Sequence, residues 1–72
     1  MVNVDKLRGK MKEARLSVED VATAMNIDRA TLYRKLNAAG ETFTIREAHQ
    51  IIEILSLNKE EVDAIFFADT VA

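Results

Sequence analysis

The stretch that decides the fold is SVEDVATAMNIDRATLYRKLN, residues 17–37. Ser17 and Asp28 are residue types that favour the first position of a helix, and only a few residues around Asn26 separate the two apolar segments that follow them. Asparagine tolerates the left-handed backbone conformation in which many helices end, so Asn26 can turn the chain sharply. The stretch therefore predicts a helix over 18–25, a short turn and a second helix over 29–36.

The apolar residues of this stretch have the spacing of two helices that pack against each other. Ala22 has a small side chain, which allows two helices to cross closely at its position. The other buried contacts are expected from Val21, Met25, Ile27, Leu32 and Leu36. Because any helical hairpin would need similar residues, the pattern predicts a helix-turn-helix without specifying its role.

Start signals outside this stretch predict three more helices, over about 4–15, 45–55 and 59–67. Their caps are Asn3, Thr44 and Asn58. Thr44 and Glu47 also have the spacing of a capping box. The inward faces of the last two helices are expected to carry Ala48, Ile51, Ile52 and Leu55, and then Val62, Ile65 and Phe66. A loop around Gly40 and a frayed tail over 68–72 complete the predicted single all-α domain, residues 1–72.

Two positions in these helices raise specific expectations. Gly9 lies inside the first helix, where glycine costs about 1 kcal/mol relative to alanine, so it marks either a close helix approach or a weak spot. Asp28 is expected to cap the helix over 29–36, with its carboxylate accepting hydrogen bonds from backbone amides.

Composition excludes several classes of protein. A chain of 72 residues buries only about 60% of its unfolded surface, and without cysteine it has neither disulfides nor thiolate metal ligands. No apolar run approaches the roughly 18 residues of a membrane span, and the N-terminus lacks the apolar region of a signal peptide. We therefore expect a cytoplasmic protein without membrane contact.

Charge is distributed unevenly along the chain although the net charge is only −2. Residues 1–40 hold eight Lys or Arg against five acidic residues, whereas residues 41–72 hold two against seven. The first part therefore carries +3 and the second −5. A basic portion on an acidic domain is compatible with a localised phosphate-binding face, and an ordinary mixed surface would also explain it.

Residues 7–37 resemble the phage Cro and repressor (Xre-type) family of helix-turn-helix DNA-binding proteins. The resemblance rests on Leu7-Arg8, Ala22, Asn26 and Leu32. It extends through FTIREAHQIIEILSLNKEEVDAIFF, residues 43–67, so it covers nearly the whole chain and implies a compact five-helix, lambda-repressor-like domain. Two residues depart from the family pattern: Asn26 replaces the usual glycine, and Val18 replaces a glutamine that often contacts a phosphate.

The resemblance implies that the helix over 29–36 enters the major groove of DNA. Its base contacts would come from Arg29, Ala30 and Arg34. Arginine can pair with the O6 and N7 atoms of guanine, and the methyl group of alanine can meet the methyl of thymine. Phosphate contacts, which set the register without reading sequence, would come from Thr31, Tyr33, Lys35 and Asn37.

Catalytic and metal-binding roles find no support in the sequence. His49 has no second histidine or cysteine with which to share a metal, and no nucleophile has a base at a sensible spacing. We expect no catalytic residues, no metal, no cofactor and no small-molecule ligand, so the protein is not expected to be an enzyme.

Two functions remain open at this stage. The first is a sequence-specific transcriptional regulator, such as a phage or prophage repressor, that binds double-stranded DNA as a homodimer on half-sites about 34 Å apart. Phe66 and Phe67 could supply the dimer contact, or Phe66 could close the core and leave Phe67 exposed. The second is a helical adaptor or antirepressor partner that keeps the fold without binding DNA, which would suit the net acidity and the valine at position 18.

Overall fold

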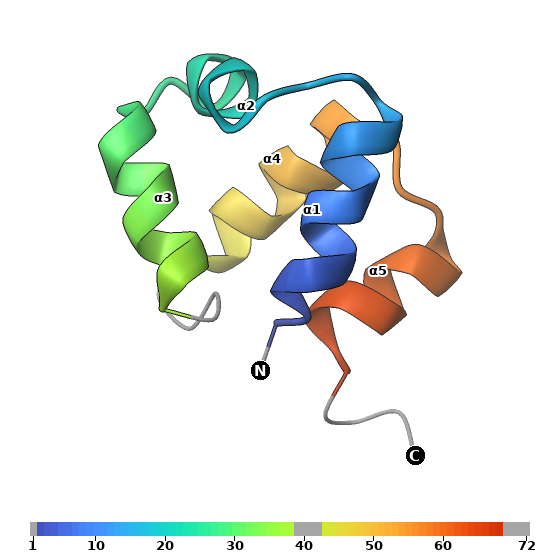
Figure 1. Ribbon diagram of the computed structural model, residues 1–72. Helices are drawn as coiled ribbons and strands as arrows, with labels where there is room; N and C mark the ends of the chain where they lie inside the picture. Colours follow the sequence, from blue (N-terminus) through green and yellow to red (C-terminus); the bar gives the residue numbers. More distant parts are fainter. Residues whose placement is uncertain (1, 39–42, 69–72) are drawn as a thin grey trace.

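The computed structural model describes residues 2–38 and 43–68, which form an all-α fold without strands. The helices in this part of the chain are α1 (Val4–Glu13), α2 (Val18–Met25), α3 (Arg29–Asn37), α4 (Ile45–Leu55) and α5 (Lys59–Phe66). In Figure 1, α4 runs behind α1, and α3 and α5 lie on opposite sides of the molecule. The predicted five-helix fold class is confirmed, whereas the loop around Gly40 and the tail over 69–72 lie outside the described residues.

Helix starts follow local capping chemistry. The side chain of Asn3 accepts the N–H of Lys6 at 3.1 Å, as predicted. Three helices begin with a complete capping box, in which the side chain of each of two residues accepts a hydrogen bond from the backbone N–H of the other. The pairs are Ser17 with Asp20, Thr44 with Glu47, and Asn58 with Glu61. The sequence predicted only the box at Thr44, because the usual pattern requires Ser or Thr followed by Glu or Gln. Aspartate and asparagine take these roles here.

The start of α3 contradicts one prediction. Asp28 has the extended backbone of an N-cap, but its carboxylate accepts no capping hydrogen bond. The side chain is exposed, so hydration of the carboxylate competes with the backbone amides. The carboxylate of Asp28, which receives no hydrogen bond from a backbone amide of the helix start, therefore lies next to Arg29 in the sequence, at the first turn of α3.

Three helices of the described chain, α1, α2 and α4, end at or next to a residue in the left-handed conformation. Asn26 closes α2 with φ 61°, as predicted, and Ile27 N–H then bonds the carbonyl of Ala22 at 3.0 Å. Arg15 (φ 59°) and Ser56 (φ 51°) take the same conformation, which the sequence did not indicate because neither residue type favours it. α1 consequently ends at Glu13 rather than at the predicted position 15.

The core draws on every helix. Its buried residues are Leu7, Met11, Val18, Val21, Ala22, Met25, Leu32, Leu36, Ile51 and Ile65. Ala22 is 1% exposed on α2, which packs against both α3 and α4, so its predicted burial is confirmed. The other predicted inward residues, Ile27, Ala48, Ile52, Leu55, Val62 and Phe66, are only half-buried. α5 ends at Phe66, one residue earlier than predicted, and α3 ends one residue later, at Asn37.

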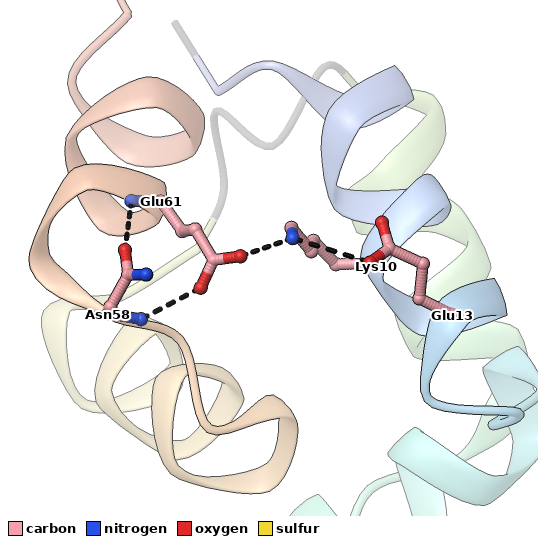
Figure 2. Close-up of polar contacts among 4 residues, drawn as sticks. All are labelled: Lys10, Glu13, Asn58 and Glu61. Atoms are coloured by element: carbon pink, nitrogen blue, oxygen red, sulfur yellow. Dashed lines mark hydrogen bonds and ion pairs between the residues drawn. The ribbon is translucent and has the colours of Figure 1, made fainter.

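A polar contact joins the first and last helices of the described chain. Lys10 of α1 forms an ion pair with Glu61 of α5, and Glu61 belongs to the Asn58 capping box, as Figure 2 shows. Glu13 approaches the same ammonium at 3.5 Å. The hydrogen bond from Lys10, followed by the one from the Asn58 N–H, lowers the pKa of Glu61. This pairing links α1 to α5, which lies on the side of the molecule away from α3.

Candidate nucleic-acid interface

The turn at Asn26 and two leucines fix the orientation of α3. Leu32 and Leu36 are 1% and 3% exposed, so one side of α3 is anchored in the core. The opposite side of the helix faces solvent at the edge of the molecule (Figure 1). The exposed residues of α3 are Arg29, Ala30, Tyr33, Arg34 and Asn37. Their spacing is that of one helical face, which we call the α3 face.

The structure therefore brings together five of the seven residues predicted to contact DNA. Thr31 is half-buried beside the α3 face. Tyr33 is 42% exposed, so part of the residue faces solvent. Arg34 forms no ion pair or side-chain hydrogen bond with the described residues, so its guanidinium is available to a ligand.

Arg29 is paired within the protein. Its Nη1 donates to Oε2 of Glu19, near the start of α2, at 3.1 Å. Both side chains remain well exposed, at 62% and 64%. The pair joins the first turn of α2 to the first turn of α3, and sequence inspection did not find it because the two residues are ten positions apart.

Lys35 has a different environment from the α3 face. Its Nζ donates to Oε1 of Glu47 at 3.1 Å, and the two side chains are only 15% and 17% exposed. Burial alone would raise the pKa of Glu47, but the Thr44 N–H and the Lys35 ammonium outweigh it, so the pKa is lowered. Lys35 therefore ties α3 to α4, and the predicted phosphate contact would require its ammonium to leave Glu47.

Two further residues do not add to the α3 face: Val18 lies inside the protein, and Lys10 belongs to another helix. Val18 is 9% exposed and belongs to the core, so the first position of α2 offers no polar group to a ligand. Lys10 of α1 is paired with Glu61. The cationic character of the surface near α3 rests on Arg29 and Arg34.

A separate apolar groove lies between the start of α4 and the end of α5. Its volume is about 340 Å³, and its lining includes Phe43, Ile45, His49, Phe66 and Phe67. Ile45 is 81% exposed and Phe67 is 52% exposed, whereas Phe66 packs partly against the core. The structure agrees with the second alternative from the sequence, in which Phe66 helps to close the core and Phe67 is exposed, and the dimer contact stays a prediction.

Comparison with protein families decides the classification. The family model of the Cro/C1-type HTH DNA-binding domain matches residues 6–62, which span α1 to the middle of α5. The chain belongs to the Cro/C1-type HTH family. Comparison with curated proteins and with solved structures gives no significant match.

Membership of the Cro/C1-type family agrees with the arrangement of α2 and α3. The matched region contains the helix-turn-helix and all of the α3 face, but it stops before Phe66 and Phe67. Within residues 2–38 and 43–68, no group of three or more His, Cys, Asp or Glu side chains could hold a metal ion. No helix in the described part of the chain has the length and apolar character needed to cross a membrane.

Proposed function

We propose that the protein is a sequence-specific transcriptional regulator, a cytoplasmic repressor of phage or prophage origin, that inserts α3 into the major groove of DNA. The observation that carries the proposal is the α3 face, which exposes Arg29 and Arg34 on a helix anchored in a Cro/C1-type domain. A helix of this kind fits the width of the major groove and presents its first residues to base edges. The family to which the chain belongs is one of DNA-binding domains rather than of enzymes.

The proposed base contacts are made by Arg29, Ala30 and Arg34. Each arginine can donate two hydrogen bonds to one guanine, and a good pair of this kind discriminates against other bases by about 1–3 kcal/mol. Tyr33, Asn37 and Thr31 are proposed to contact phosphates from the α3 face and its border. Lys35 is left out of the proposed interface because its ammonium is bonded to Glu47.

A dimer is proposed because one small domain makes few base contacts. Phe67 and Ile45 provide exposed apolar surface on the groove between α4 and α5, and α5 lies opposite α3. Two copies that met through this groove would bury these side chains and present two α3 faces to half-sites about 34 Å apart. Phe67→Ser should then lower the dimer fraction in sedimentation velocity without altering the fold, whereas unchanged sedimentation would remove Phe67 from the interface.

Selection of bound duplexes from a random DNA library tests the proposed function directly. We expect an enriched palindromic sequence, and an affinity for it whose logarithm falls linearly with the logarithm of salt concentration. Arg34→Ala should relax the base preference at one position of each half-site. Arg46→Ala is the matched control, because Arg46 is an exposed cation on α4, outside the α3 face. The absence of binding to any duplex at low salt would refute the proposal.

A helical protein-interaction module is the second candidate function. Two of the three cations of α3, Arg29 and Lys35, are already paired with carboxylates, and an exposed apolar groove exists elsewhere on the domain. Such a module would bind a protein through the groove that Ile45 and Phe67 line, and it would not bind DNA. The library selection separates the two candidates, because only a DNA-binding regulator would enrich a sequence.

A further inference from the structure

Glu19 is an acidic residue beside the start of α3, where the proposed function requires attraction to DNA. It lies in the first turn of α2, and its carboxylate accepts a hydrogen bond from Arg29, the first residue of α3. The pair lines an open hollow between the two helices, together with Thr23, Ile27, Asp28 and Ala30. A free carboxylate in this position would repel the phosphates of any approaching duplex.

Stabilisation of the α2 start does not explain the pairing with Arg29. An acidic residue near a helix N-terminus is favourable because of the helix dipole, with or without a cationic partner. Glu60 occupies the equivalent position of α5, two residues after the cap, and forms no ion pair with the described residues. The bond from Glu19 to Arg29 is therefore a feature of the α2–α3 junction and not of acidic helix starts in general.

We propose that Glu19 is a positioning residue that holds the guanidinium of Arg29 for recognition of guanine, an inference that rests on the proposed function. Arginine has five N–H donors in one plane, and the bond through Nη1 leaves donors free for the O6 and N7 atoms of a base. A guanidinium held in advance loses less rotamer freedom when it meets its base. The pair thus favours the correct base over an unspecific contact.

The same carboxylate weakens binding to incorrect sequences. When Arg29 meets guanine, the guanidinium lies between Glu19 and the base, and its positive charge offsets the carboxylate. On a sequence without guanine at that position, the guanidinium gains no base contact, while the carboxylates of Glu19 and Asp28, which line the same hollow, still lie at the face that meets the duplex. Repulsion of wrong partners is a recognised source of specificity, and here it acts through a residue that need not touch a base.

Competition binding with Glu19→Gln tests the inference. The variant Arg29→Ala identifies the base position that Arg29 reads, because the preference for guanine is lost there. The measured quantity is the preference for guanine at that position. We expect Glu19→Gln to lower that preference by about tenfold, within the range that one arginine–guanine pair supplies, and to strengthen binding to unspecific duplexes by a few-fold. Both side chains are well exposed, so the melting temperature should change little.

Two comparisons isolate the positioning role. Glu60→Gln removes the same charge from the same helix position of α5, and it should leave the base preference unchanged. In the Arg29→Ala background, Glu19→Gln should have no further effect at the same base position, because the residue that it positions is absent. An equal effect in both backgrounds would show that Glu19 acts independently of Arg29 and would overturn the inference.

The possible failures are distinguishable. If the wild-type protein selects a sequence and Glu19→Gln retains the full preference for guanine, the inference is wrong and the proposed function stands. If the wild-type protein binds no duplex at low salt, the proposed function is wrong and the positioning role is wrong with it.

Discussion

Replacement of Lys35 by methionine tests whether this residue forms an internal ion pair or contacts DNA. Methionine keeps the apolar stem of lysine but removes the ammonium, whose Nζ lies 3.1 Å from Oε1 of Glu47. The same carboxylate still accepts the N–H of Thr44 at 2.9 Å in the capping box of α4. The replacement therefore removes one tie between α3 and α4 and leaves the start of α4 capped.

The magnitude follows from the burial of the pair. Exposed ion pairs contribute about 0.2–1 kcal/mol, whereas removing one partner of a fully buried pair costs about 3–5 kcal/mol. The two side chains, at 15% and 17% exposure, lie between these cases, so the free energy of unfolding should fall by about 1–2 kcal/mol. Since about 1 kcal/mol moves the Tm of a domain of this size by roughly 4–8 °C, the expected fall is about 4–16 °C.

Thermal unfolding followed by circular dichroism measures this loss, and a salt titration of DNA binding measures the number of phosphate contacts. For Lys35→Met we expect a lower Tm and an unchanged slope of log affinity against log salt. In a double-mutant cycle, the effects of Lys35→Met and Glu47→Gln on stability should be less than additive. Arg34→Met is the matched control, and it should change DNA binding without lowering the Tm.

The opposite pattern would refute this reasoning. An unchanged Tm for Lys35→Met, together with a salt slope reduced in magnitude by about 1, would mean that the ammonium contacts a phosphate. Lys35 would then leave Glu47 when DNA binds, and α3 would not depend on α4 for its position.

Three further predictions concern stability. Gly9→Ala should raise the free energy of unfolding by about 1 kcal/mol, because a Cβ at this exposed helix position meets no atom within 4 Å, and urea denaturation of the two proteins measures the gain. The pKa of Glu61 is lowered by Lys10, so its contribution to stability is present above its ordinary value of 4.5 and is lost as the pH falls through the folded-state pKa. Glu61→Gln should accordingly make the Tm fall less steeply with decreasing pH in this acid range. Ile65→Ala should cost about 2–5 kcal/mol, since the side chain is 0% exposed, and a urea midpoint close to that of the wild-type protein would contradict its place in the core.

Local chemistry allowed most of the fold to be predicted from the sequence. Helix starts at Asn3, Ser17, Thr44 and Asn58 follow from side chains that satisfy amides within three residues. The left-handed residues at the ends of α1 and α4 were not predicted, because Arg15 and Ser56 are residue types that disfavour this conformation. Surrounding contacts imposed that conformation, such as the bond from the Leu16 N–H to the carbonyl of Met11 at 2.9 Å.

The sequence by itself determined the helix-turn-helix, because the capping residues, the turn at Asn26 and the apolar spacing all act over a few residues. It also identified α3 as the candidate interface helix. Only the tertiary structure decided how the cations of α3 are used. Arg29 bonds Glu19 and Lys35 bonds Glu47, whereas Arg34 is left without a partner among the described residues. The physical reason is that each partner comes from another helix, α2 or α4, so its position depends on how the helices pack.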